Sequence, residues 1–349
     1  MISNTGIFNH RTLTIMLTYR CTAACNHCGT FSTPKDTTKV SMEAVCKAID
    51  EAEQLGFLNV VFTGGEATLY MENLLSGIKY AKEKKFPVRL VTNAHWASSI
   101  ENTQKVLHKL IDAGLDEINF STGDEHLKFV PIENIYNAVS VATELELTNL
   151  LMYEERDNAN ASKEVIEHTI NKLTNEEKRK KWFKMISSPW MPLDYHTKSF
   201  QTNNTLSNHT NVVSKTGCDS ILNTYVLQGD GKIASCCGLG IRHIPELHPT
   251  DTTEENFLAN AIVKSESDWI KIALKQLGPE KILAWASSKN PNILWENMYN
   301  HTCQSCIRLY KDSEVIDTVL EHFDELKIDL LSTIIIDKKM ERELLDIRV

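Results

Sequence analysis

The sequence predicts an α/β protein built as a partial (β/α)6, TIM-like barrel with a C-terminal α+β extension. The first observation is that β-like runs alternate with helical patterns of about 10–15 residues, which is typical of βαβ units and a parallel sheet. The second is a polar stretch rich in Asn, Ser and Thr, residues 197–215, which indicates a linker. We therefore expect a barrel over residues 1–196 and a second domain over residues 216–349.

Six strand-and-helix units follow one another along the predicted barrel. The β-like runs are residues 12–19, 59–63, 87–96, 117–126, 148–155 and 181–189. The helical runs between them are residues 41–56, 72–85, 100–114, 132–145 and 161–173. The first helix has Ser41 as its expected N-cap and Gly56 as its C-terminal stop.

The second domain begins with a hairpin pattern, residues 222–235, whose centre is a Gly-Asp-Gly turn. A helical insertion is expected at about residues 241–300, with one run over 254–277 and another over 280–288. The amphipathic pattern of residues 313–331 predicts a C-terminal helix.

Three cysteines follow the first strand in the spacing C-x3-C-x2-C, namely Cys21, Cys25 and Cys28. Three thiolates on one loop cannot complete a set of disulfides among themselves, and they suit a soft metal. A 4Fe–4S cluster takes one cysteine ligand for each iron, so three ligands leave one iron open to a small molecule. A zinc site with a distant fourth ligand and buried free thiols are the alternatives.

At these residues the chain resembles the radical SAM superfamily, although His27 stands where that family often has an aromatic residue. The resemblance implies that the open iron binds S-adenosylmethionine (SAM). Gly64, Gly65 and Glu66 resemble the second motif of the superfamily, which binds the amino group of SAM, with Ala67 in place of the usual proline. The two glycines alone would also fit a plain turn between a strand and a helix.

Polar residues at later strand ends extend this candidate SAM site. Asn93 ends the third strand, and Ser121 and Asp124 end the fourth. The resemblance implies that Ser121 meets the ribose of SAM, and that Asp124, Glu125 and His126 face SAM or the substrate. Turn and capping roles are the alternatives for these residues. Because ligands of such folds bind at the carboxyl ends of the strands, we expect these side chains to meet the cysteine loop.

A second set of cysteines surrounds the predicted hairpin and ends in a C-x2-C pair. Cys218, Cys236, Cys303 and Cys306 form a pattern of four thiolates that fits zinc or a second iron–sulfur cluster. The spacing resembles the twitch extension of radical SAM enzymes, a shorter relative of the SPASM domain. That resemblance implies an auxiliary 4Fe–4S cluster held by these four residues, with structural zinc as the alternative.

Cys237 remains outside this assignment. The Cys-Cys pair resembles radical SAM epimerases of ribosomal peptides, in which a 5′-deoxyadenosyl radical removes a Cα hydrogen and a cysteine thiol returns one from the opposite face. This resemblance implies L-to-D epimerisation with Cys237 as the hydrogen donor.

Peptide crosslinking through thioether or C–C bonds and a twitch-type dehydrogenation are alternative reactions. A zinc-stabilised binding scaffold is the alternative without catalysis. The expected partners are a ribosomal precursor peptide and an electron donor such as flavodoxin or ferredoxin.

Composition and charge exclude several other classes of protein. The net charge of −9 argues against nucleic-acid binding. No apolar run approaches the ~20 residues of a membrane span, and the first residues do not form a secretory signal. Nine cysteines without such a signal indicate metal binding in a reducing compartment, so we expect a cytoplasmic protein. Because the first strand begins so early, we expect no separate leader-binding domain before it.

Overall fold

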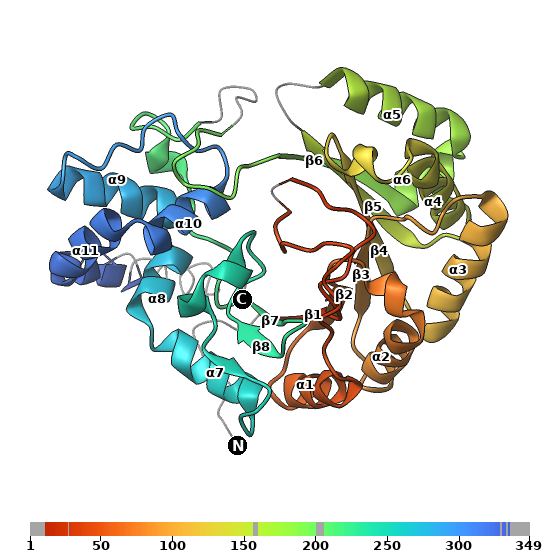
Figure 1. The fold of residues 1–349 in the computed structure, drawn as a ribbon, viewed down its shortest axis with the longest axis horizontal. Coiled ribbons are helices and arrows are strands. Elements are labelled where there is room, and N and C mark those ends of the chain that lie inside the picture. The colour runs from red at the N-terminus through yellow and green to blue at the C-terminus, as the bar shows by residue number, and fades with distance from the viewer. Residues whose placement is uncertain are drawn as a thin grey trace, which may run out of the picture.

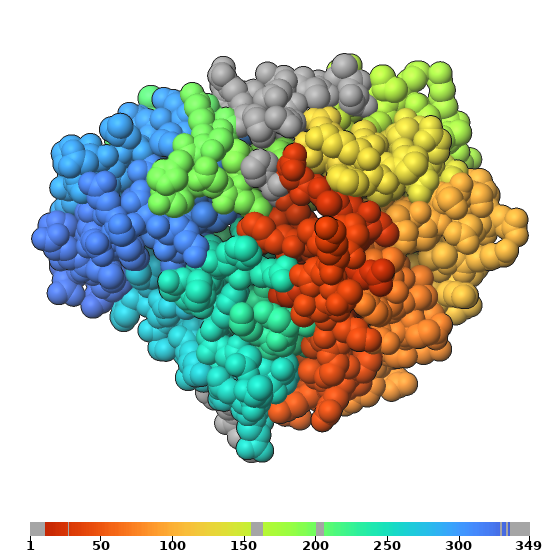
Figure 2. Space-filling view, in the orientation of Figure 1, coloured from red at the N-terminus to blue at the C-terminus, as the bar shows by residue number. Residues whose placement is uncertain are grey.

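A computed structural model describes residues 11–26, 28–155, 160–199, 206–328, 330–332 and 334–335. In this part of the chain, nine strands form one sheet in the order β6-β5-β4-β3-β2-β1-β7-β8-β9. Figure 1 shows the strands in the middle of the molecule, with α1–α5 along one outer side and α7–α11 on the other. On the face seen in Figure 2, the N-terminal residues, in red, lie between these two halves.

The barrel half contains the predicted alternation of strands and helices. Its parallel strands are β1 (Thr12–Met16), β2 (Asn59–Thr63), β3 (Val88–Thr92), β4 (Glu117–Gly123), β5 (Thr148–Glu155) and β6 (Phe183–Pro189). Its helices are α1 (Met42–Gln54), α2 (Met71–Glu83), α3 (Ile100–Ala113), α4 (Ile132–Glu144), α5 (Asn160–Leu173) and the short α6 (Glu176–Trp182). The prediction of a partial barrel is confirmed, and the barrel is open because β6 and β9 form the two edges of the sheet.

Local sequence signals explain where these helices begin and end, as α3 illustrates. Ser99 Oγ accepts a hydrogen bond from Asn102 N at 3.2 Å and caps the first turn. Gly114 ends the helix with φ 104°, a backbone angle that favours glycine. The apolar spacing of 3.6 residues then buries one face of the helix, which consists of Thr103, Leu107, Leu110 and Ala113.

The C-terminal half extends the barrel sheet. Its strands are β7 (Thr224–Leu227), β8 (Lys232–Ala234) and β9 (Thr250–Asp251), and its helices are α7 (Phe257–Glu266), α8 (Trp269–Gln276), α9 (Pro279–Lys289), α10 (Thr302–Lys311) and α11 (Ser313–Glu321). The predicted hairpin is present as β7 and β8, which pair antiparallel. Strand β7 also pairs in parallel with β1, with Thr12 opposite Thr224. The division into residues 1–196, 197–215 and 216–349 stays a prediction, and residues 200–205 of the linker lie outside the described residues.

Strand β1 contributes to two separate hydrophobic cores because its successive side chains point to opposite faces. Leu13 and Ile15 join the first core, which lies between the strands and α1–α5 and also includes residues of α7. Met16, and Tyr19 just after the strand, join the second core, which β7, β8 and the C-terminal helices enclose. The two halves of the protein therefore share the strand that leads into the cysteine loop.

Two details of the C-terminal half differ from the sequence prediction. The single helix expected over residues 254–277 is two helices, because the Asp268 carboxylate accepts hydrogen bonds from Ile270 N at 3.0 Å and Lys271 N at 3.2 Å and starts α8. The helix expected over residues 313–331 is interrupted at His322, where α11 ends. Across the described residues, no helix has both the length and the apolar character needed to cross a membrane.

Glu51 joins the two halves, and its removal tests how much this contact stabilises the protein. Its buried carboxylate accepts hydrogen bonds from Leu258 N at 2.8 Å and Ala259 N at 3.3 Å, at the start of α7. Because a charged acceptor at a helix N-terminus is lost, we expect Glu51→Ala to lower the free energy of unfolding by about 2 kcal/mol. Glu53→Ala removes only a surface ion pair to Lys84 and should cost under about 1 kcal/mol. Urea unfolding followed by circular dichroism measures both, and equal losses would contradict the assignment.

Candidate functional site

The carboxyl ends of the barrel strands border a cavity of about 220 Å³, here named the cysteine-loop cavity. Eight of the residues singled out in the sequence line it: Cys21, Cys25, Cys28, Gly64, Gly65, Asn93, Ser121 and His126. They come from the loop after β1 and from the ends of β2, β3 and β4, which lie side by side in the sheet. The fold therefore brings this part of the predicted SAM site together, whereas Glu66 and Asp124 do not line the cavity.

The two glycines are required by close packing against the cysteine loop. Gly64 has φ +151°, and a Cβ atom there would lie 2.5 Å from Thr18 O. A Cβ atom on Gly65 would lie 2.3 Å from Arg20 O. The backbone of this turn is hydrogen-bonded to the same segment, with Gly65 N donating to Thr18 O at 2.7 Å. The pair thus holds the end of β2 against the start of the cysteine loop while it faces the cavity.

Glu66 lies behind the cavity wall and organises it. Its side chain is 1% exposed. The carboxylate accepts hydrogen bonds from Thr68 Oγ1 at 2.6 Å, Thr92 Oγ1 at 2.9 Å and Asn93 N at 2.9 Å. Asn93 Nδ2 in turn donates to Thr22 Oγ1 at 3.1 Å and lies 3.6 Å from Cys21 Sγ. Glu66 therefore joins the ends of β2 and β3 and orients Asn93 toward the cysteine loop.

Ser121 and Asp124 end the same strand region but occupy different surroundings. Ser121 lines the cavity, as its predicted contact with a ligand requires. The Asp124 carboxylate accepts a hydrogen bond from the Tyr153 hydroxyl at 3.1 Å. A direct contact between Asp124 and a cofactor stays a prediction.

Cys21 and Cys25 of the cysteine loop lie in surroundings that disfavour the charged form of their thiols. Burial raises the pKa of Cys21 to about 11 and that of Cys25 to about 12, with further repulsion from neighbouring anionic groups. A metal ion would reverse this balance, because a coordinating thiol loses its proton outright. Three thiols on one cavity wall, beside the open strand ends, fit a soft-metal cluster that leaves room for a small ligand.

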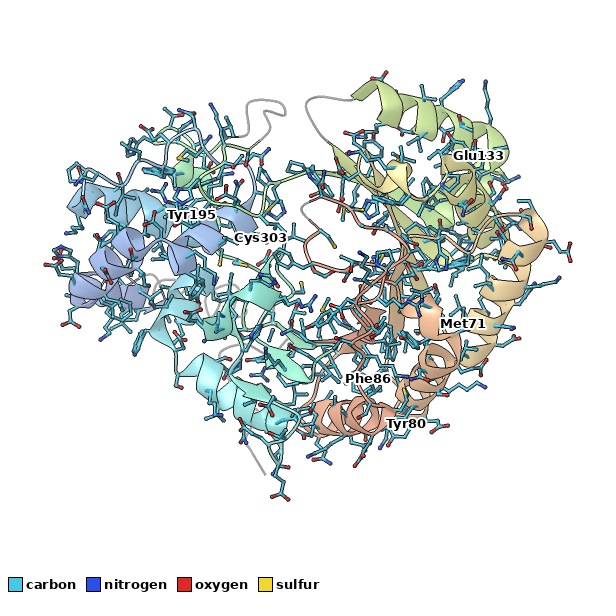
Figure 3. The ribbon with its side chains drawn as sticks, in the orientation of Figure 1. Met71, Tyr80, Phe86, Glu133, Tyr195 and Cys303 are labelled. Atoms are coloured by element: carbon cyan, nitrogen blue, oxygen red, sulfur yellow. The ribbon has the colours of Figure 1, made fainter. Side chains whose placement is uncertain are left out.

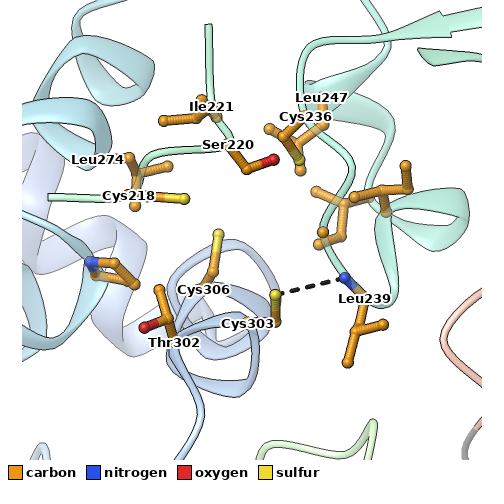
Figure 4. A pocket seen from close by; sticks show the side chains of 14 residues that line it. Cys218, Ser220, Ile221, Cys236, Leu239, Leu247, Leu274, Thr302, Cys303 and Cys306 are labelled. Atoms are coloured by element: carbon orange, nitrogen blue, oxygen red, sulfur yellow. Dashed lines mark hydrogen bonds between the residues drawn. The ribbon is translucent and has the colours of Figure 1, made fainter. Parts of the chain in front are cut away.

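The second set of cysteines lines another cavity, named here the four-cysteine cavity. Cys218, Cys236, Cys303 and Cys306 point into it from the start of the hairpin region, the end of β8 and α10 (Figure 4). The other side chains of this wall are mainly aliphatic: Ile221, Leu239, Ile241, Ile244, Leu247 and Leu274. Figure 3 shows Cys303 at the inner side of the helical half, whereas Tyr80 lies on the outer helices of the barrel half.

Burial also disfavours the charged form of Cys236, Cys303 and Cys306 in this cavity. It raises the pKa of Cys303 to about 12 and those of Cys236 and Cys306 well above the usual range. Within the described ranges, no three Cys, His, Asp or Glu side chains converge closely enough to share one metal ion. Four thiols line this cavity, which is the number that a 4Fe–4S cluster takes with one thiolate for each iron.

Cys237 differs from its neighbour Cys236 in exposure and in partners. Cys236 is 6% exposed, whereas Cys237 is an exposed free thiol. The sulfur of Cys237 lies 3.1 Å from Ser220 Oγ, which also accepts a hydrogen bond from Cys237 N at 2.9 Å. Cys237 lines neither cavity, but Leu239, two residues later, lines both.

Residues that the sequence reasoning missed, or weighed only lightly, complete the cysteine-loop cavity. Glu154 lies near the end of β5, and Trp190 directly follows β6. Their places at strand ends are a signal that would have identified them from the sequence. Leu239 comes from the C-terminal half and carried no such signal.

Comparison with known proteins agrees with this geometry. Residues 15–150 match the family model of the radical SAM superfamily. The chain is 28% identical over 129 residues to the putative peptide biosynthesis protein YydG of Bacillus subtilis (strain 168). That alignment covers 37% of this chain and only 40% of the relative.

Two solved structures resemble the whole fold at low sequence identity. Native anSMEcpe with bound AdoMet and Cp18Cys peptide has a TM-score of 0.54 at 11% identity, over 93% of this chain and 99% of that chain. Streptococcus suis SuiB bound to precursor peptide SuiA has a TM-score of 0.50 at 13% identity, over 88% of this chain and 74% of that chain. At these identities the likeness establishes the fold alone.

Glu66→Gln tests whether Glu66 orients Asn93. The amide group would place N–H donors against the donors of Thr68, Thr92 or Asn93, so the network must break. We expect a loss of about 2 kcal/mol in the free energy of unfolding and a roughly tenfold higher dissociation constant for SAM. Anaerobic titration calorimetry measures the second effect. Glu72→Gln, at an exposed position of α2, is the control, and equal SAM affinity in both variants would refute the role of Glu66.

Proposed function

Because residues 15–150 form a radical SAM domain, we propose that this protein is an enzyme that modifies a ribosomally made peptide by radical chemistry. The observation that carries the proposal is the C-x3-C-x2-C loop at the carboxyl ends of the strands, which shares one cavity with Gly64, Gly65 and Asn93. A peptide is supported as substrate by the name of the Bacillus relative and by the peptides bound in the two similar structures. The nine cysteines and the implied clusters suit a reducing, cytoplasmic setting.

Cys21, Cys25 and Cys28 would hold a 4Fe–4S cluster, and Gly64, Gly65, Asn93 and Ser121 would surround SAM. When bound, the cluster and SAM supply one electron and a 5′-deoxyadenosyl radical that abstracts hydrogen. The protein residues orient SAM and keep water away from the reacting carbon. Glu66 acts here through Asn93, while Asp124 remains a candidate for direct contact.

An auxiliary 4Fe–4S cluster held by Cys218, Cys236, Cys303 and Cys306 is the second part of the proposal. Four thiols around one mainly aliphatic cavity support it, because each iron of such a cluster takes one thiolate. A single structural zinc ion bound by the same four thiols is the alternative, and metal analysis separates the two.

Epimerisation at a Cα atom is the reaction that best uses Cys237, the exposed cysteine outside both cluster assignments. The radical takes the Cα hydrogen of an L-residue, and the Cys237 S–H bond breaks to give a hydrogen atom to the opposite face. The thiyl radical then needs one electron and one proton, and an external donor of the flavodoxin or ferredoxin class supplies the electron. The exposure of Cys237, and its place beside a loop that reaches both cavities, support this role.

Iron content tests the two cluster assignments. Anaerobically reconstituted wild-type protein should bind about eight irons and as many sulfides. We expect about four irons after Cys21→Ala/Cys25→Ala/Cys28→Ala, with complete loss of 5′-deoxyadenosine release from SAM under dithionite. Cys303→Ala/Cys306→Ala should also leave about four irons but retain some SAM cleavage.

Cys46→Ala is the matched control for the iron measurement, because Cys46 lies on α1 and lines neither cavity. It should keep the full iron content. Zinc without iron in the wild-type protein would refute both cluster assignments.

Cys237→Ala tests epimerisation. With a synthetic copy of a precursor peptide encoded beside this gene, the wild-type enzyme in D2O should add one deuterium at one Cα of the product. The variant should lose at least about 100-fold in product while 5′-deoxyadenosine is still released, because the radical forms but receives no hydrogen. Mass spectrometry and chiral amino-acid analysis measure both products.

Cys237→Ser separates hydrogen donation from positioning, since it keeps a partner for Ser220 but has an O–H bond too strong to give up hydrogen. It should behave as Cys237→Ala does. Unchanged D-residue formation in either variant would exclude Cys237 as donor. A product lighter by two hydrogens would indicate crosslinking or dehydrogenation instead.

A further inference from the structure

Three buried polar atoms on one side of the cysteine-loop cavity have no hydrogen-bond partner among the described residues. They are His126 Nδ1, Glu154 Oε2 and Trp190 Nε1, and all three residues line the cavity. His126 follows β4, Glu154 lies in β5 and Trp190 follows β6. We name these three residues the polar wall.

The three side chains form one continuous surface. His126 Nδ1 lies 3.3 Å from Glu154 Oε2, although the angle does not meet hydrogen-bond geometry. The rings of His126 and Trp190 are 6.5 Å apart and nearly perpendicular, at 89°. Trp190 is only 7% exposed. Because an unsatisfied buried polar group is costly, three of them on one cavity wall indicate a ligand that binds there.

The position of the polar wall separates it from the residues proposed for SAM. Among the residues proposed for SAM, Gly64, Gly65 and Asn93 lie at the ends of β2 and β3 and Ser121 lies in β4, whereas Glu154 and Trp190 lie farther along the sheet, at the ends of β5 and β6. The carboxylate of Glu154 would also repel the carboxylate of SAM. The polar wall therefore faces the part of the cavity that remains for a substrate.

The donors and acceptors of the polar wall match a peptide group. The indole N–H of Trp190 can only donate a hydrogen bond, and an ionised Glu154 can only accept one. A backbone amide offers one carbonyl acceptor and one N–H donor. We propose that the wall binds one backbone amide of the substrate, with the carbonyl at Trp190 Nε1 and the N–H at Glu154 Oε2. His126 Nδ1 lies beside the same carboxylate, 3.3 Å from Oε2, and the inference rests on the proposed function.

This mode of binding has a consequence for specificity. Contacts to a backbone amide do not depend on the side chain of the bound residue. A substrate peptide held in this way would present the Cα atom next to the bound amide to the part of the cavity proposed for SAM. The polar wall thus fixes the depth of the peptide in the cavity, and other surfaces select its sequence.

The test uses a pool of N-acetylated pentapeptide amides built from amino acids that are deuterated only at Cα. With SAM and dithionite, the wild-type enzyme should move deuterium from Cα into 5′-deoxyadenosine, to an extent that saturates with pool concentration. Trp190→Phe removes only the N–H donor and should raise the half-saturating concentration about tenfold. Glu154→Gln should raise it by a similar factor. The SAM dissociation constant should stay within about twofold in both variants.

Trp295→Phe is the matched control. Trp295 Nε1 is likewise buried without a partner, and the residue is 2% exposed, but it lines neither described cavity. This variant should leave deuterium transfer unchanged, which separates loss of a cavity contact from loss of a buried indole N–H.

The possible outcomes separate this inference from the proposed function. If both Trp190→Phe and Glu154→Gln transfer deuterium as the wild-type enzyme does, the inference is wrong. A weaker SAM affinity in those variants, with an unchanged response to the pool, assigns the polar wall to SAM and also overturns it. Wild-type release of 5′-deoxyadenosine without deuterium overturns the inference alone. No release of 5′-deoxyadenosine overturns the proposed function, and the inference with it.

Discussion

The parallel pairing of β1 with β7 is the constraint on which the rest of the structure depends. Strand β1 leads into the cysteine loop, and β7 begins the hairpin that ends at Cys236. Because parallel strands end at the same edge of a sheet, this pairing places the turn after β7 beside the start of the cysteine loop, where the Tyr19 hydroxyl donates a hydrogen bond to Gln228 Oε1 at 3.1 Å. The segment after Cys236 then returns to this loop, where Gly240 N donates to Gly29 O at 2.8 Å. The side chains of β1 then supply both hydrophobic cores, so neither half can be displaced without disturbing the other.

Contacts between loops strengthen this arrangement at the strand ends. The Arg242 guanidinium lies 3.6 Å from the centre of the Tyr19 ring and donates hydrogen bonds to Phe31 O at 3.1 Å and Asp36 Oδ2 at 2.8 Å. The ring of His243 stacks on that of Phe31 with centroids 3.9 Å apart. The segment that follows Cys236 and Cys237 is therefore packed on the loop that follows Cys28.

The two cavities differ in chemistry although both hold cysteines. The four-cysteine cavity is enclosed by aliphatic side chains, which favours a group that stays in place. The cysteine-loop cavity combines thiols with glycines, an amide, a hydroxyl and the polar wall. Such a mixture suits ligands that enter, react and leave.

Local signals in the sequence were sufficient for much of this protein. The alternation of strands and helices, the cap at Ser99 and the spacing of the first three cysteines each depend on residues close together in the chain, so pattern alone determined the barrel and the cysteine loop. The four cysteines that a family resemblance, rather than local pattern, grouped together line one cavity, and their role as cluster ligands stays a prediction.

Only the tertiary structure decided the pairing of β7 with β1, because Thr12 and Thr224 meet across two hundred residues of chain that carry no sign of it. It also decided that Glu66 supports the cavity from behind, and that His126, Glu154 and Trp190 share one wall. A sequence pattern specifies which face of a strand a side chain takes, whereas the partners of that side chain depend on how all the strands are assembled.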